Sequence, residues 1–265
     1  GNAVLMPLPD GGLLLFYTLA YGEPSPWSHS LVHYRFSEDD GRTWGPAGVL
    51  TEEFGYICRQ PGLVLATGEW LLPIYDNRGG GRSGHPGIAA DEGCVAVSGD
   101  GGRHWARYGR MVADAGCAQP AVVELAEGHL VAYLRTRNHW NGHDPAWACL
   151  YRSESVDGGR NWTPPARTAV PNNNSGIALL RLRSGALLLA YNHQTTRERS
   201  PLNLALSTDG GATWSAGREL EPYDPAAATG YSYPALAQTP DGRVHVAYTY
   251  RRTHIKHVVF DQEWV

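Results

Sequence analysis

The chain has 265 residues, of which 42% are hydrophobic, and a formal net charge of −4. That is enough apolar material for a sizeable core, and the slightly acidic balance gives no reason to expect nucleic acid as a partner. No apolar run approaches the roughly 20 residues that a membrane span needs, so we expect no membrane association. The many glycines (32), prolines (18) and tyrosines (14) are typical of short strands joined by tight turns.

An apolar stretch follows a turn glycine five times along the chain. The glycines are 57, 60, 57 and 57 residues apart. The stretches cover residues 13–17, 70–75, 130–134, 187–191 and 244–248, after Gly11, Gly68, Gly128, Gly185 and Gly242. A near-constant long period built from short strands predicts a β-propeller rather than a sandwich.

Each repeat has the strands of one four-stranded antiparallel blade. A first strand such as residues 121–125 precedes the glycine, and a third strand such as residues 31–36 follows a long loop. A short fourth strand completes the blade, except in the fifth repeat, which ends after a third strand over residues 255–260. No helical period extends over a useful length. We therefore predict one all-β domain over residues 1–265, with five blades.

A turn of the form Ser-x-Asp-x-Gly-x-x-Trp occurs four times, at residues 37–44, 98–105, 155–162 and 207–214. Its Asp can accept hydrogen bonds from backbone amides further along the turn, and its Gly permits positive φ. The turn resembles the Asp-box, or BNR repeat, of the sialidase-like β-propellers. We expect these Asp residues to serve folding and not turnover.

One face of the propeller should carry the site, because loops on a rigid scaffold carry function. Counting back from the turn glycines places Asn2, Gln60, Gln119, Gly176 and Tyr233 at the heads of the innermost strands. Arginines and aromatics gather on this face, and guanidinium groups bind carboxylates in two hydrogen bonds. The pattern predicts an anionic sugar as ligand. The candidate substrate-binding residues are Arg59, Asp76, Gln119, Arg135, Asn174, Asn192, Arg199, Tyr233 and Arg251.

The resemblance to sialidases implies further roles. Residues 230–236, Gly-Tyr-Ser-Tyr-Pro-Ala-Leu, resemble the stretch that holds the sialidase nucleophile, and Tyr231 matches it. Arg135, which follows a Val-Val-Glu-Leu run, matches the second sialidase arginine. Arg199, before an Asn-Leu-Ala-Leu-Ser strand, lies nearest to the third. His193 is a second catalytic candidate, because it could assist ionisation of the Tyr231 phenol.

Two features depart from the sialidase pattern. Gln119 stands where a sialidase has the Glu that activates the Tyr, and Gln cannot serve as a base. The Arg-Ile-Pro motif with the first arginine, and the acid Asp after it, belong to a preceding blade that this sequence does not contain. The resemblance is to six-bladed proteins, so it implies a six-bladed propeller if one blade is missing from this sequence. Otherwise the ring would have an open gap or would take a blade from another chain.

The sequence predicts a glycoside hydrolase that releases a terminal acidic sugar, with Tyr231 as nucleophile. A lyase or non-sialic glycosidase acting on uronate glycans, and a sugar-binding propeller without catalysis, remain as alternatives. We expect no cofactor and no metal ion, since the four cysteines lack zinc spacing. Free buried thiols are expected, with a Cys58–Cys117 disulfide as an alternative. An oligomer remains open, and a glycan-degrading enzyme would be secreted or periplasmic.

Overall fold

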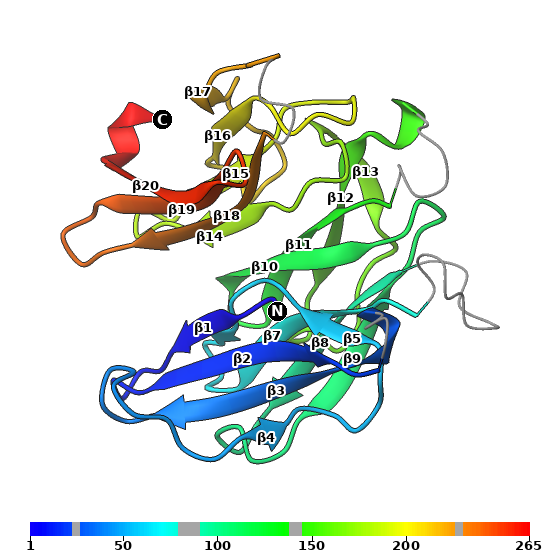
Figure 1. Ribbon diagram of the computed structural model, residues 1–265, viewed down its shortest axis with the longest axis vertical. Helices are drawn as coiled ribbons and strands as arrows, with labels where there is room; N and C mark the ends of the chain where they lie inside the picture. The colour runs from blue at the N-terminus through cyan, green and yellow to red at the C-terminus, as the bar shows by residue number, and fades with distance from the viewer. Residues whose placement is uncertain (23–26, 79–90, 138–144, 226–229) are drawn as a thin grey trace.

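Five antiparallel sheets are arranged around a common axis in the computed structural model (Figure 1), which describes residues 1–22, 27–78, 91–137, 145–225 and 230–265. The strands follow the chain order outward from the axis within each sheet. Three short 3-10 turns are the helical elements of the described residues: η1 (Trp27–His29), η2 (Pro145–Trp147) and η3 (Gln262–Trp264). The predicted five-bladed all-β propeller is confirmed.

The first two blades occupy residues 1–111. Blade 1 consists of β1 (Val4–Pro7), β2 (Leu13–Ala20), β3 (Ser30–Ser37) and β4 (Gly48–Val49). Blade 2 consists of β5 (Tyr56–Cys58), β6 (Leu63–Val64), β7 (Trp70–Asp76), β8 (Glu92–Ser98) and β9 (Ala106–Met111). Because β5 and β6 both pair with β7, they are two halves of one interrupted innermost strand.

The remaining three blades occupy residues 118–260. Blade 3 consists of β10 (Ala118–Ala126), β11 (His129–Arg135), β12 (Cys149–Ser155) and β13 (Ala166–Pro171). Blade 4 consists of β14 (Ala178–Arg181), β15 (Leu187–Tyr191), β16 (Leu202–Ser207) and β17 (Arg218–Glu221). Blade 5 has three strands: β18 (Tyr231–Gln238), β19 (Val244–Tyr250) and β20 (His254–Phe260).

The hydrophobic core lies between successive blades rather than in one central mass. Since strand side chains alternate between the two faces of a sheet, an interior blade supplies one apolar row to each neighbour. In β7, for example, Leu71 packs in the cluster shared with blade 3, while Leu72 and Ile74 pack in the cluster shared with blade 1. Two further clusters join blade 3 to blade 4 and blade 4 to blade 5.

Each Asp-box fixes its turn by the same hydrogen bonds. In the third copy, Ser155 Oγ donates to Asp157 Oδ1 over 2.8 Å, and the backbone amides of Arg160 and Asn161 donate to the same oxygen. The Trp residues that end the boxes of blades 2, 3 and 4 pack toward the preceding blade, as Trp214 does by donating to Tyr133 Oη over 3.0 Å. The boxes therefore fasten the turn and the blade interface, as a structural role requires.

The two terminal blades expose apolar side chains on the faces turned away from their neighbours. Leu5 in β1 is 49% exposed between Val4 and Met6, which both pack against blade 2. Ile255 in β20 is 67% exposed. A sixth blade would cover such faces, and its presence stays a prediction.

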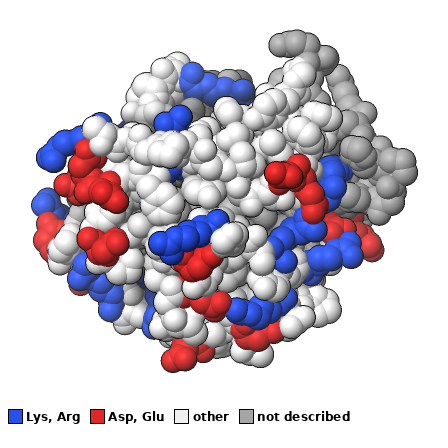
Figure 2. Space-filling view, turned by 90° about the horizontal axis from the view of Figure 1, so that it is seen from below, with Lys and Arg blue, Asp and Glu red and all other residues white. Residues whose placement is uncertain are grey.

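Other general features bear on partners and redox chemistry. Acidic and basic side chains are interspersed over the face shown in Figure 2. Among the described residues, no helix is long and apolar enough to span a membrane. All four cysteines are buried free thiols, so the alternative of a Cys58–Cys117 disulfide is wrong.

Candidate functional site

A bulge interrupts the innermost strands of blades 3 and 5 at the same place. In β10, Gln119 and Pro120 lie between the register pairs Ala118–Arg135 and Ala121–Tyr133, where the partner strand has one residue. In β18, Tyr233 and Pro234 occupy the equivalent bulge. A bulge re-aims side chains that regular alternation would direct elsewhere.

Both bulged residues adopt the left-handed conformation. Gln119 has φ +54° and Tyr233 has φ +55°, while Asn2, at the equivalent place in blade 1, has φ +52°. A non-glycine residue in this region costs on the order of 1–3 kcal/mol, and such strain clusters at functional sites. The repeated strain identifies the inner rim as the place to look for a site.

Tyr233 is surrounded by arginines from three other blades. The guanidinium carbons of Arg59 and Arg199 each lie 5.1 Å from the centre of its ring. Arg199 also donates a hydrogen bond to the phenol, and Arg135 acts on it electrostatically. Partial burial alone would raise the pKa of Tyr233, but the arginines outweigh it, and the pKa falls below its usual value of 10.

Arg135 is the most deeply placed of these arginines. Its residue is 7% exposed, and its Nη1 donates to the carbonyl oxygen of Asn174 over 2.9 Å. Burial, together with the nearby charges of Arg137 and Arg199, lowers its pKa to about 10. Within the described part of the chain, no carboxylate forms an ion pair with Arg59, Arg135 or Arg199. We call these three arginines with Tyr233 the arginine cluster.

Gln119 forms part of the wall beside the arginine cluster. Its side chain lies within hydrogen-bonding reach of the buried Tyr75 phenol, whose pKa is raised by burial. Its Oε1 is buried and accepts no hydrogen bond from the described residues. Gly176 fits between this oxygen and Tyr233, because a Cβ there would lie 3.2 Å from Oε1 and 3.0 Å from the tyrosine ring. The wall therefore offers an unsatisfied acceptor beside the unpaired guanidiniums.

Tyr231 lies apart from the arginine cluster, in the core between blades 4 and 5. Its residue is 2% exposed, its ring packs edge-on against Tyr248, and burial raises its pKa. Its phenol is hydrogen-bonded to Arg251, which also pairs with Asp224. The expectation that Tyr231 lines the pocket with the arginines does not match this geometry, because the bulge turns Tyr233 toward them instead.

Three other candidates also have structural partners elsewhere. Asn192 is fully buried, and its Nδ2 donates to the carbonyl oxygens of Pro201 and Tyr231. His193 is exposed and its Nδ1 lies 2.9 Å from Tyr191 Oη, beside a groove between blades 3 and 4. Asp76 pairs with Arg78 on the opposite face of β7 from Tyr75. None of the three joins the arginine cluster through a contact between described residues.

The candidate residues did not include Tyr75, nor the buried pair Arg137–Asp91 behind Arg135. Tyr75 follows its turn glycine by seven residues, as Arg135 does, and this shared offset was the available signal. Arg137 Nε donates to Asp91, which is fully buried. Burial raises the pKa of Asp91, although Arg137 and Arg135 oppose the shift. No set of three or more metal-ligating side chains gathers among the residues described.

Comparison with known proteins agrees with this architecture. The chain is 24% identical over 263 residues to an anhydrosialidase of Macrobdella decora, covering 90% of this chain and 32% of that protein. It is 25% identical over 201 residues to a sialidase of Bacteroides fragilis, covering 69% and 33%. The chain thus spans about a third of these relatives' lengths.

A solved structure, the Hadza microbial sialidase, superposes with a TM-score of 0.79 at 17% identity, over all of this chain and 53% of that one. This likeness concerns the fold. The model of the BNR repeat-like domain matches residues 1–246. The chain therefore belongs to the BNR repeat-like domain family.

Proposed function

We propose that the arginine cluster binds the carboxylate of a terminal acidic sugar and that the chain hydrolyses its glycosidic bond, as a sialidase does. One observation carries the proposal. Arg59, Arg135 and Arg199 meet without a carboxylate partner in the described residues, and Arg135 is buried. An unpaired buried charge costs several kcal/mol, so such a site favours an anionic ligand. Relatives named sialidase and anhydrosialidase agree with this reading.

Within this proposal Tyr233 is the nucleophile. Its phenol lies beside the guanidiniums that would hold the carboxylate, and it is 40% exposed, so a sugar can reach it. Sialidases are glycosidases with a Tyr nucleophile, and a neutral phenol repels an anionic sugar less than a carboxylate would. In its phenolate form Tyr233 attacks the anomeric carbon, and the glycosidic oxygen departs with the electron pair of its C–O bond and takes a proton from water. Water then cleaves the bond between sugar and enzyme, which restores the tyrosine and releases the sugar with retained configuration.

Activation of Tyr233 would differ from that in a sialidase with a Glu partner. Gln119 has no basic oxygen to accept the phenol proton, but the arginines lower the pKa of Tyr233 and so increase its phenolate fraction. The rate of hydrolysis should also depend on how much protonation the leaving group needs. An aryl glycoside is the most informative substrate for a first assay, because its leaving oxygen needs little protonation.

A lyase for uronate-containing glycans is the second candidate function, because Gln119 cannot act as the base that a sialidase Tyr requires. In that reaction the arginines would neutralise the uronate carboxylate, and Tyr233 as phenolate would abstract the proton from the carbon next to it. The glycosidic oxygen on the adjacent carbon would then leave as the carbon–carbon double bond forms. The third candidate is a sugar-binding propeller without catalysis, in which Gln119 is a hydrogen-bonding wall residue.

The test combines turnover with binding. The chain is assayed with a fluorogenic aryl sialoside, and the released sugar is followed by NMR for the configuration at its anomeric carbon. Uronate polysaccharides are assayed for the ultraviolet absorbance of an unsaturated product. Retained configuration supports the hydrolase, an absorbance rise supports the lyase, and saturable binding without turnover supports the lectin. Failure of every acidic sugar to bind would overturn the anion site itself.

A further inference from the structure

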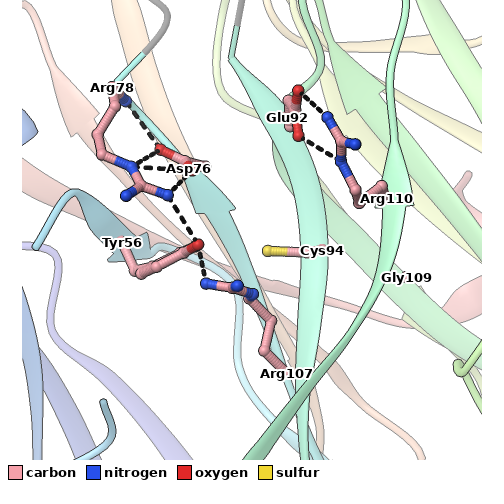
Figure 3. A pocket seen from close by; sticks show the side chains of 8 residues that line it. All are labelled: Tyr56, Asp76, Arg78, Glu92, Cys94, Arg107, Gly109 and Arg110. Carbon is pink, nitrogen blue, oxygen red and sulfur yellow. Dashed lines mark hydrogen bonds and ion pairs between the residues drawn. The ribbon is translucent and has the colours of Figure 1, made fainter. Parts of the chain in front are cut away.

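A pocket of about 290 Å³ that is lined mostly by charged residues lies on blade 2, on the sheet face turned toward blade 1. Figure 3 shows its two walls, with Cys94 between them on β8. Asp76 lines it from the face of β7 opposite to Tyr75, so the pocket is separate from the arginine cluster. The lining residues are Tyr56, Asp76, Arg78, Glu92, Cys94, Arg107, Gly109 and Arg110.

A bulge in β9 leaves this part of the blade hollow. Gly109 and Arg110 together oppose Cys94, because they lie between the register pairs Val95–Tyr108 and Gly93–Met111. Gly109 has φ +65°, and an added Cβ would lie 2.2 Å from Trp162 Cδ1, which packs on the side of blade 3. The bulge directs Arg110 to the same face as Cys94, where it reaches Glu92.

Two other blades carry larger residues at the position that corresponds to Cys94. Cys94 stands four residues before the serine of its Asp-box, as do Tyr151 in blade 3 and Asn203 in blade 4. Tyr151 pairs across the strands with Arg167, and Asn203 pairs with Glu219. Blade 2 has the small Cys94 at this position, opposite the bulge at Gly109 and Arg110, so the pocket is a local property of this sequence and not of the propeller.

Paired charges form the two walls. On one wall, Arg78 Nε donates to Asp76 Oδ1 over 3.0 Å and Arg78 Nη2 donates to Asp76 Oδ2 over 2.5 Å. The same Nη2 also donates to Tyr56 Oη over 3.0 Å. Arg107 contacts the same phenol and donates to Glu53 over 2.9 Å. Every group on this wall therefore has a fixed direction before any ligand arrives.

The facing wall is built in the same way. Arg110 Nε and Nη2 donate to the two Glu92 oxygens over 2.8 and 2.5 Å. Each paired carboxylate keeps lone pairs, and each guanidinium keeps N–H groups, that can bond a hydroxyl. Because the charges are already neutralised in pairs, the walls favour a hydroxyl-rich neutral ligand over a free anion. The volume lies near the lower end of the roughly 300–1,000 Å³ of small-molecule sites, which suits one sugar ring.

We propose that this pocket is a second carbohydrate site, which binds one neutral hexose residue through hydroxyl contacts to Asp76, Glu92 and Arg107. The site does not depend on turnover at the arginine cluster. It would hold a glycan by a neutral sugar while an acidic sugar occupies the propeller axis, or bind a neutral glycan alone.

The test measures binding of free galactose, glucose and N-acetylglucosamine to the full chain by saturation-transfer NMR and titration calorimetry. We expect saturable binding of at least one sugar, weakened tenfold or more in Arg107→Ala and Glu92→Gln. The Arg107 side chain is 42% exposed, so its removal should leave the fold intact, as thermal melting would verify. Arg243→Ala is the matched control, since it breaks an exposed pair with Asp241 in the turn after β18, and it should leave binding unchanged.

A further variant separates this site from the proposed hydrolase. Arg135→Met alters the arginine cluster and should leave neutral sugar binding intact, whatever it does to acidic sugars. The proposal is overturned if no neutral sugar binds saturably, or if folded Arg107→Ala binds as well as the unaltered chain. It is also overturned if inorganic sulfate binds here and neutral sugars do not, because the pocket would then be an anion site.

Discussion

Replacing Arg135 by Met should separate binding from stability. This guanidinium is buried near Arg137 and Arg199, and burial and like charge both lower its pKa. Its one hydrogen bond to a described residue runs to the carbonyl oxygen of Asn174. Met keeps most of the apolar stem volume but removes the charge.

The two expected effects have opposite signs. Exchanging a buried charge for an apolar side chain is often neutral or stabilises by about 1–4 kcal/mol, while the lost bond to Asn174 costs about 1 kcal/mol. We therefore expect an unchanged or raised melting temperature. Binding of an acidic sugar should weaken by about 2–4 kcal/mol, or roughly 30- to 1,000-fold, since a desolvated charge partner is lost.

Arg137→Met is the matched control two residues away. It leaves the fully buried Asp91 without its ion pair, so it should destabilise the fold by about 3–5 kcal/mol. Calorimetric binding of a free acidic sugar and thermal melting are measured for both variants. If Arg135→Met lowers the melting temperature as Arg137→Met does while acidic sugar still binds normally, the charge of Arg135 is structural and the anion site is refuted.

Four further predictions concern the tyrosines and the Asp-boxes. Tyr233→Phe should abolish turnover and retain sugar binding, whereas Tyr231→Phe should retain turnover because that ring lies in the blade core; the opposite pattern in the aryl sialoside assay would return the nucleophile to Tyr231. Because the arginines lower the pKa of Tyr233, Tyr233→Phe should remove an early part of the tyrosine ionisation in a spectrophotometric titration; an unchanged curve would contradict the lowered pKa. Asp157→Ala should lower stability by about 1–3 kcal/mol in denaturant melts without changing kcat, since it removes the acceptor of the box turn. The pKa of Asp39 is lowered to about 2 by its bonds to Thr43 and Ser37, so its stabilising effect is complete above about pH 4 and lost as pH falls toward 2; melting at stepwise lower pH should show Asp39→Asn losing less than the unaltered chain.

The sequence by itself determined the propeller and the position of its strands. The apolar stretch expected at residues 187–191 is β15 to the residue, and the stretch expected at 130–134 lies within β11. Turn glycines such as Gly128 (φ +72°) and the Asp-box bonds around Asp157 act over a few residues, so their pattern is legible in the chain. Because these turn features are local, their repeat period can be read from the sequence.

The tertiary structure decided which tyrosine faces the arginines. Tyr231 and Tyr233 are two residues apart, and regular alternation would direct them to the same face of a strand. The bulge at Tyr233 breaks that alternation, and only the arrangement of blades around the axis brings Arg59, Arg135 and Arg199 to its ring. The hollow beside Cys94 depends likewise on the pairing of β8 with β9. Such contacts join residues that are distant in the chain, and no local pattern records them.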